Sequence, residues 1–277
     1  MLGPGTPVRA PVTPHGVPRV PPPQPLDGVP PTPADLVLDP APTPGWIAHD
    51  VEEELPGLEL LSWTTEGTEW RRRSPRWARD WLGRLSTRVD GPTVLNAHRE
   101  DAPAAHRELL RRIGRDPNED RAPQEAAYHD RIKHGGFPHR GTPKDILLLV
   151  LLETGVPIWA LDADRITGDL GIRRSLLGEL EAGEPAPRRR GPAGRLLGRP
   201  DPAEEAAARP PRRPEPVVVD GTGVVAEIGR EPRDPFVARR RTTRTTFFCA
   251  RVPGLPDLRV EEAIWMCRSL VERGEDD

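Results

Sequence analysis

The chain has 277 residues and a net charge of −3, and its 37 prolines and 26 glycines supply nearly a quarter of it. That share approaches the range of low-complexity chains, without the strict period of collagen. No apolar run approaches the ~20 residues that a membrane-spanning helix needs, which excludes that class. The overall charge argues against strong, unspecific binding to nucleic acid.

Proline divides the chain into segments. Fifteen of the 37 prolines lie in residues 1–45 and nine in residues 184–216. We expect the first segment to be a disordered, extended tail and the second to be a Pro/Arg-rich flexible linker. Residues 46–183 then form an α/β domain, which residues 217–277 complete with strands and a C-terminal helix.

The two cysteines, Cys249 and Cys267, are too few for a disulfide framework. Both end or belong to hydrophobic runs, so we expect packed, unreactive thiols. The N-terminus shows no apolar signal core after a basic start, and a cytoplasmic location is the expectation.

The first part of the domain contains mixed strand and helix signals. The predicted strands are Leu58–Trp63 and Thr93–Asn96, and the predicted helices are Pro75–Leu85, Ala102–Ile113, Pro123–His134 and Leu170–Ala182. Within the first helix, Trp77, Trp81 and Leu85 fall on one face. We expect this aromatic stripe to pack in the core rather than form a ligand cage.

The clearest element is a helix over residues 142–155. Thr142 is the expected N-cap, Pro143 takes the first helical position and Gly155 supplies the C-terminal cap. Its interior, residues 146–152, is apolar on every side, which predicts burial nearly all round. The apolar run from Val156 to Leu161 follows at once and predicts a strand covered on both faces. These two elements predict an α/β fold with a mostly parallel sheet flanked by helices.

Three further elements follow the predicted linker. Val217–Val219 and Val224–Ile228 flank Asp220-Gly221-Thr222-Gly223, which predicts a hairpin or two sheet strands. Thr242–Val252 is rich in β-formers, and apolar residues from Val260 to Val271 recur at helical spacing.

Acidic residues at the predicted strand ends are the first candidate site. Ligands of parallel sheets bind beyond the carboxyl ends of strands, so Asp162, Asp164 and Asp220 could converge there. Such carboxylates could hold Mg²⁺ or act as nucleophile and acid. Leu161–Ile166 resembles the first motif of haloacid-dehalogenase-type phosphohydrolases, although both lysines of the chain precede it. The alternative, which we favour, is that these carboxylates cap turns.

Histidines and arginines supply the remaining candidates. His129, His134 and His139 recur every five residues, a spacing that does not bring them together on a helix, and we expect no metal site there. The cluster Arg239, Arg240, Arg241 and Arg244 could bind phosphate groups of nucleic acid. Because nearly every basic residue of this chain is arginine, a solvated surface is the favoured interpretation.

A resemblance to a known family rests on three segments, which are Trp70–Trp77, Gly155–Trp159 and Val217–Asp220. Their order resembles the C-terminal domain of actinobacterial vWA-MoxR-associated proteins. The resemblance implies a part in a bacterial multi-protein system of the conflict or defence type, and it assigns no role to a particular residue.

The sequence therefore predicts a non-catalytic interaction or regulatory module that binds a protein partner. The alternatives are a metal-dependent phosphohydrolase that uses Asp162 and Asp164, and nucleic-acid binding through Arg239–Arg244. No cofactor is assigned.

Overall fold

The structure is a computed structural model that describes residues 38, 40–182 and 213–273. Most of the expected tail over 1–45 and most of the expected linker over 184–216 lie outside the described residues. The described ends of these segments contribute to the sheets, because Thr43 and Pro44 form one strand and Pro216 begins another. Within the described residues, no helix has the length and apolar character to cross a membrane.

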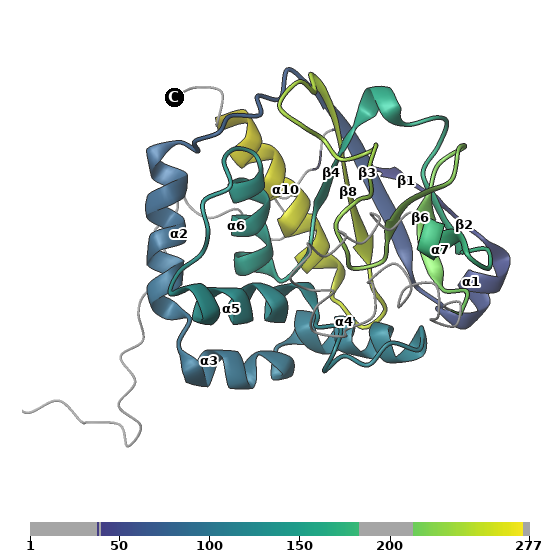
Figure 1. Ribbon diagram of the computed structural model, residues 1–277, viewed down its shortest axis with the longest axis horizontal. Coiled ribbons are helices and arrows are strands. Elements are labelled where there is room, and N and C mark those ends of the chain that lie inside the picture. The colour runs from purple at the N-terminus through teal and green to yellow at the C-terminus, as the bar shows by residue number, and fades with distance from the viewer. Residues whose placement is uncertain (1–37, 39, 183–212, 274–277) are drawn as a thin grey trace, which may run out of the picture. The chain divides into compact units, whose positions relative to one another are not determined.

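The helices and strands are spread along the whole described chain (Figure 1). The helices are α1 His49–Glu54, α2 Arg76–Arg88, α3 Gly91–Asn96, α4 Asp101–Arg112, α5 Pro123–His134, α6 Lys144–Thr154, α7 Glu179–Ala182 and α10 Asp257–Arg273, with short 3-10 turns η2 Ala97–Arg99 and η3 Ala163–Arg165. The strands are β1 Thr43–Pro44, β2 Trp46–Ile47, β3 Glu59–Glu66, β4 Trp159–Asp162, β5 Gly171–Arg174, β6 Pro216–Val219, β7 Val224–Glu227 and β8 Arg244–Arg251.

The strands form two four-stranded sheets, in the orders β1-β3-β8-β4 and β2-β5-β6-β7. Every pair in the first sheet is antiparallel, and in the second the pair β2–β5 alone is parallel. The prediction of a mostly parallel sheet is therefore wrong. A continuous apolar run shows that a strand is buried, and it carries no information on the direction of its neighbours.

The strand predicted from the apolar run after Gly155 is β4, which lies at the edge of its sheet. Its outer edge is covered by residues 236–238. The Asp162 amide donates to the Phe236 carbonyl at 2.8 Å, and Leu161 forms an isolated antiparallel bridge with Val237. This cover explains why Ala160 and Leu161 are buried although they lie in an edge strand.

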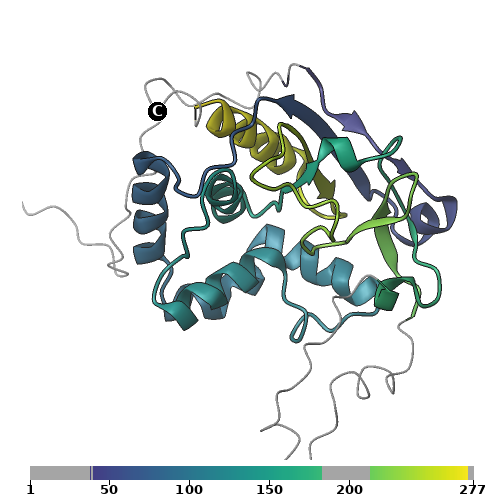
Figure 2. The same ribbon diagram turned by 45° about the horizontal axis from the view of Figure 1, so that its top comes forward.

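Helices α2, α6 and α10 lie side by side next to the first sheet (Figures 1 and 2). The Trp81 indole of α2 donates to the Glu153 carboxylate of α6 at 2.8 Å. From α10, the Arg268 guanidinium lies 5.3 Å from the centre of the Trp63 ring, which stacks on Phe247 of β8. The predicted aromatic stripe of α2 packs against this core, as expected.

Candidate functional site

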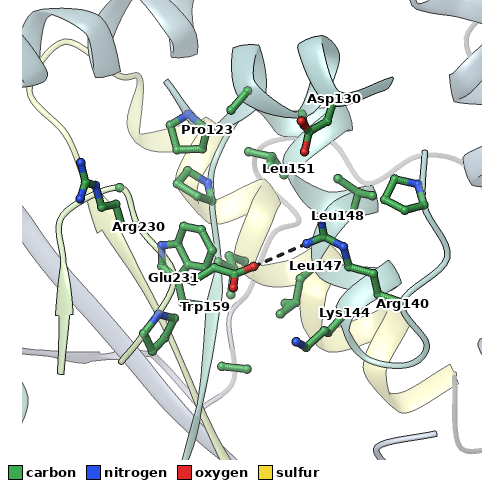
Figure 3. A pocket seen from close by; sticks show the side chains of 18 of the residues that line it. Pro123, Asp130, Arg140, Lys144, Leu147, Leu148, Leu151, Trp159, Arg230 and Glu231 are labelled. Carbon is green, nitrogen blue, oxygen red and sulfur yellow. Dashed lines mark ion pairs between the residues drawn. The ribbon is translucent and has the colours of Figure 1, made fainter. Parts of the chain in front are cut away.

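The described part of the chain contains a half-open pocket of about 540 Å³. It lies between α5, α6, β4 and the segment 229–238 that follows β7. Pockets of ~300–1,000 Å³ are typical of ligand sites. Its floor is apolar and includes Pro123, Leu147, Leu148, Leu151, Ile158 and Trp159 (Figure 3).

Helix α6 divides its apolar side chains between the core and this pocket. Ile146, Leu149 and Val150 are fully buried. Leu147, Leu148 and Leu151 are partly exposed and line the pocket. The expectation that α6 is buried nearly all round is wrong on this face, and a partly open apolar helix face is typical of a binding surface.

The caps of α6 differ from the prediction at one end. Gly155 ends the helix in the left-handed conformation (φ 76°), as expected. At the start, Pro143 rather than Thr142 is the N-cap, and the Thr142 hydroxyl contacts Ser74 instead. The buried Asp145 carboxylate of the first turn accepts from the Arg140 amide at 2.6 Å and from the Ser74 hydroxyl at 2.9 Å. This carboxylate thereby fixes the backbone that carries Arg140 to the pocket.

The opposite wall, residues 229–238, is held by ion pairs and hydrogen bonds of its own. The Arg233 guanidinium donates to Glu227 at 2.7 Å and to the Leu180 carbonyl at 3.1 Å. Arg230 binds Asp120 at 2.8 Å, which ties this wall to the segment before α5. The pocket is therefore preformed, with walls anchored independently of any ligand.

Charged side chains of both signs surround the apolar floor. Arg140 and Lys144 come from the α6 side, Glu231 from the facing wall and Asp130 from α5 (Figure 3). An Arg140 nitrogen lies 3.5 Å from a Glu231 oxygen, and the two side chains are 50% and 67% exposed. The ion pair crosses the pocket, as the dashed line in Figure 3 shows.

The acidic residues predicted as a site are engaged in turns and ion pairs. Asp162 caps η3 by accepting from the Asp164 amide at 3.3 Å. Asp164 is exposed and pairs with Arg244 at 2.9 Å. Among the described residues, no group of three or more His, Cys, Asp or Glu side chains is placed to hold a metal ion.

Asp220 is the third of these residues and is buried. Its carboxylate accepts from the Thr167 amide at 2.8 Å, from the Thr222 amide and hydroxyl at 2.8 and 2.7 Å, and from the Gly223 amide at 3.1 Å. Burial alone would raise the pKa of this carboxyl, but the hydrogen bonds outweigh burial and lower the pKa. Asp220 thus holds the β6–β7 turn against the loop after η3.

The arginine cluster is partly neutralised. Arg239 pairs with Asp234 at 2.5 Å, and Arg244 pairs with Asp164 and, at 3.6 Å, with Glu66. Arg240 and Arg241 are exposed. Two of the four guanidiniums thus already have carboxylate partners, which supports the solvated-surface interpretation.

The three candidate histidines lie at or near the pocket and α6, and the two cysteines lie in the core. His129 lines the pocket, the His134 ring bonds the Asp130 carbonyl at 2.9 Å, and His139 lies 3.6 Å from Asp145. Both thiols are fully buried, and burial raises the pKa of Cys249 to about 12 and that of Cys267 as well. As predicted, both are packed and poorly ionised at neutral pH.

The pocket itself was missed in the sequence, since its leucines were assigned to the core. The signal was present in the fully apolar surface of α6, which exceeds what one packed face requires. Comparison with protein-family models gives no match, and comparison with curated proteins gives none either. The vWA-MoxR-associated resemblance therefore stays a hypothesis, and the geometry of the pocket is the basis for a functional proposal.

Proposed function

We propose that this chain is a non-catalytic interaction module whose pocket on α6 receives apolar side chains of a partner protein. The observation that carries the proposal is the apolar floor of Leu147, Leu148, Leu151 and Trp159, which is open to solvent in the described part of the chain. Full burial of a leucine contributes roughly 1.5–3 kcal/mol. A partner that covers this floor therefore gains binding free energy without rearranging the walls.

A protein partner fits the pocket because an apolar centre with a charged rim of both signs is the usual anatomy of a protein interface. The half-exposed Trp159 adds an aromatic side chain of the kind that dominates binding energy in such interfaces. The resemblance to vWA-MoxR-associated proteins supports a regulatory place in a cytoplasmic, multi-protein bacterial system.

The test is selection of peptides from a random-peptide display library on the immobilised full-length chain. Selected peptides should be rich in apolar residues, and the affinity of each should be measured by fluorescence anisotropy. Leu148→Asp places a charge on the pocket floor and should abolish binding. Leu177→Asp is the matched control, because Leu177 is 71% exposed and lies outside the pocket.

Circular dichroism must show that both variants keep the wild-type spectrum, and Leu147→Ser serves as a milder second pocket variant. Equal binding by the wild type and by both pocket variants would contradict the proposal. Binding of a small apolar dye in the pocket, with no selected peptide that depends on Leu148, would show a small-molecule site instead.

A further inference from the structure

The ion pair that crosses the pocket has a consequence for the chemistry of the partner, and the inference drawn from it rests on the proposed function. Arg140 and Glu231 reach toward one another from opposite walls, above the leucines of α6 (Figure 3). Both side chains are at least half exposed, and exposed ion pairs are weak. A partner segment that enters the pocket can therefore separate this pair at little cost.

The backbone position of Arg140 is fixed by contacts other than its ion pair with Glu231. Its amide is bound by the buried Asp145, so the backbone below the guanidinium does not depend on Glu231. A guanidinium presents paired donors that match a carboxylate. When an occupant displaces Glu231, the same donors are available to a carboxylate of the occupant.

A second cation reinforces this end of the pocket. Lys144, in the first turn of α6, lies on the same side of the pocket as Arg140 (Figure 3). Within residues 38, 40–182 and 213–273, no carboxylate forms an ion pair with Lys144 at 4.0 Å or less. Among the same residues, Asp130 forms no ion pair with Arg140 or Lys144 at 4.0 Å or less.

Asp120, an acidic residue that lines the pocket, is already engaged. It lies 3.3 Å from an Arg115 nitrogen and 2.8 Å from an Arg230 nitrogen. Arg140 and Lys144 therefore offer an acidic group of the partner two cations on one side of the pocket.

We propose that the partner segment carries an acidic residue beside its apolar residues, and that this carboxylate replaces Glu231 at Arg140, with Lys144 as the second cation. The pocket thus selects acidic-apolar segments over neutral or basic ones. Glu231 acts as an internal competitor that occupies Arg140 until the partner arrives.

The experiment uses peptides selected from the random-peptide library on the full-length chain, each also synthesised with its acidic residue changed to the amide. Wild-type protein should bind the acidic form about tenfold more tightly than the amide form, as for a charge-assisted hydrogen bond. Arg140→Ala should reduce this preference to about twofold or less, with a smaller change in the affinity for the amide form than for the acidic form. Arg76→Ala, an exposed arginine of α2, is the matched control and should keep the preference.

Glu231→Gln should change the peptide affinity in the opposite direction to Arg140→Ala. This distinguishes a role of the ion pair in recognition from a purely structural role. Removal of the internal competitor should tighten binding of the acidic form by about threefold, the scale of an exposed ion pair, and binding of the amide form by less, because an amide gains less from the freed Arg140 guanidinium. Apolar peptides that bind through Leu148 with no acidic preference would overturn this inference and leave the proposed function intact. Failure to select any peptide that depends on Leu148 would overturn both.

Discussion

Two regions of the molecule use their side chains in opposite ways. Around Arg115, beside the second sheet, charged groups are buried and bind one another: its guanidinium donates to Glu215 at 2.6 Å, to Glu227 at 3.1 Å and to the Ile228 carbonyl at 3.1 Å. At the pocket, charged groups stay exposed at the rim, and the apolar side chains below them remain open.

This difference in burial indicates which residues are candidates for a function. A charge taken out of water is costly unless it is paired and hydrogen-bonded, so the buried acids and arginines of the first region are committed to the fold. The pocket shows the reverse pattern, with ordinary leucines that lack full cover and a weak ion pair that can be exchanged. The buried acids and arginines around Arg115 are therefore the charged residues with the least freedom to bind a ligand.

The largest expected effect comes from breaking the buried network. Arg115→Met should lower the free energy of unfolding by about 3–5 kcal/mol, because Glu215 and Glu227 lose a guanidinium at buried positions. Urea unfolding of the full-length chain measures this change. Arg112→Met, which removes an exposed pair with Glu108, is the control and should cost about 1 kcal/mol or less. Similar losses in the two variants would show that the network adds little.

The two faces of α6 allow the same comparison within one helix. Leu149→Ala should lower the free energy of unfolding by about 2–5 kcal/mol, since Leu149 is fully buried. Leu148→Ala, on the pocket face, should cost less than about 1.5 kcal/mol, because its side chain is already partly hydrated. Equal losses would mean that the pocket face is part of the core, against the proposed function.

Much of the secondary structure could be predicted, because it depends on local periodicity and caps. The helices α2, α4, α5, α6 and α10 and the strands β3, β6, β7 and β8 all occur where they were expected. Pairing direction could not be predicted in this way. The antiparallel β6–β7 pair is the hairpin that the sequence offered as one alternative. Pairs such as β3 with β8, where Leu61 faces Cys249, join segments far apart in sequence, and no local pattern gives their direction.

Two predicted elements were wrong for reasons that become clear in three dimensions. Leu170–Ala182 was expected to be one helix, but Gly171 lies in β5 under the Trp46 ring, where an added Cβ would come within 2.1 Å of it. Gly178, with φ 81°, then interrupts the chain before α7. Thr93–Asn96 was expected to be a strand, yet the Asp90 carboxylate accepts from the Thr93 amide at 2.9 Å and caps helix α3.

The candidate site was less predictable than the fold. Asp162, Asp164 and Asp220 were singled out because a parallel sheet would collect them at one edge, and this argument fails with the antiparallel topology. The pocket depends on how residues 229–238 pass beside β4 and face α6, an arrangement between segments that no local pattern encodes.

A smaller change in the free energy of unfolding is expected from Asp220 in the β6–β7 turn, and a still smaller one from Asp164 at the surface. Asp220→Ala should lower the free energy of unfolding by about 1–3 kcal/mol, because it leaves the Thr167, Thr222 and Gly223 amides without their acceptor. Asp164→Ala should change it by less than about 1 kcal/mol, since its pair with Arg244 is exposed. Thermal or urea unfolding measures both. A greater loss for Asp164→Ala would point to a role for that carboxylate beyond its exposed ion pair.

The smallest effect is expected from His106, which is buried between α4 and the sheets. Its ring bonds the Ala102 carbonyl at 2.8 Å, and burial lowers the pKa of the ring below its ordinary value of 6.5. Below about pH 6.5 the unfolded chain therefore takes up a proton that the folded chain does not. This histidine should lower the free energy of unfolding as the pH falls, by at most about 1.4 kcal/mol per pH unit.

The contribution of His106 can be isolated by comparison with His106→Gln, which cannot titrate. Glu227 and Asp120 line the small cavities beside the ring, and both are bound to Arg115 in the wild type. Urea unfolding between pH 7 and pH 5 should give a steeper decline for the wild type than for the variant, because the carboxylates are common to both proteins. Parallel curves would mean that the buried ring is protonated as easily as in the unfolded chain, and the packed side of the molecule would then tolerate a charge as the pocket rim does.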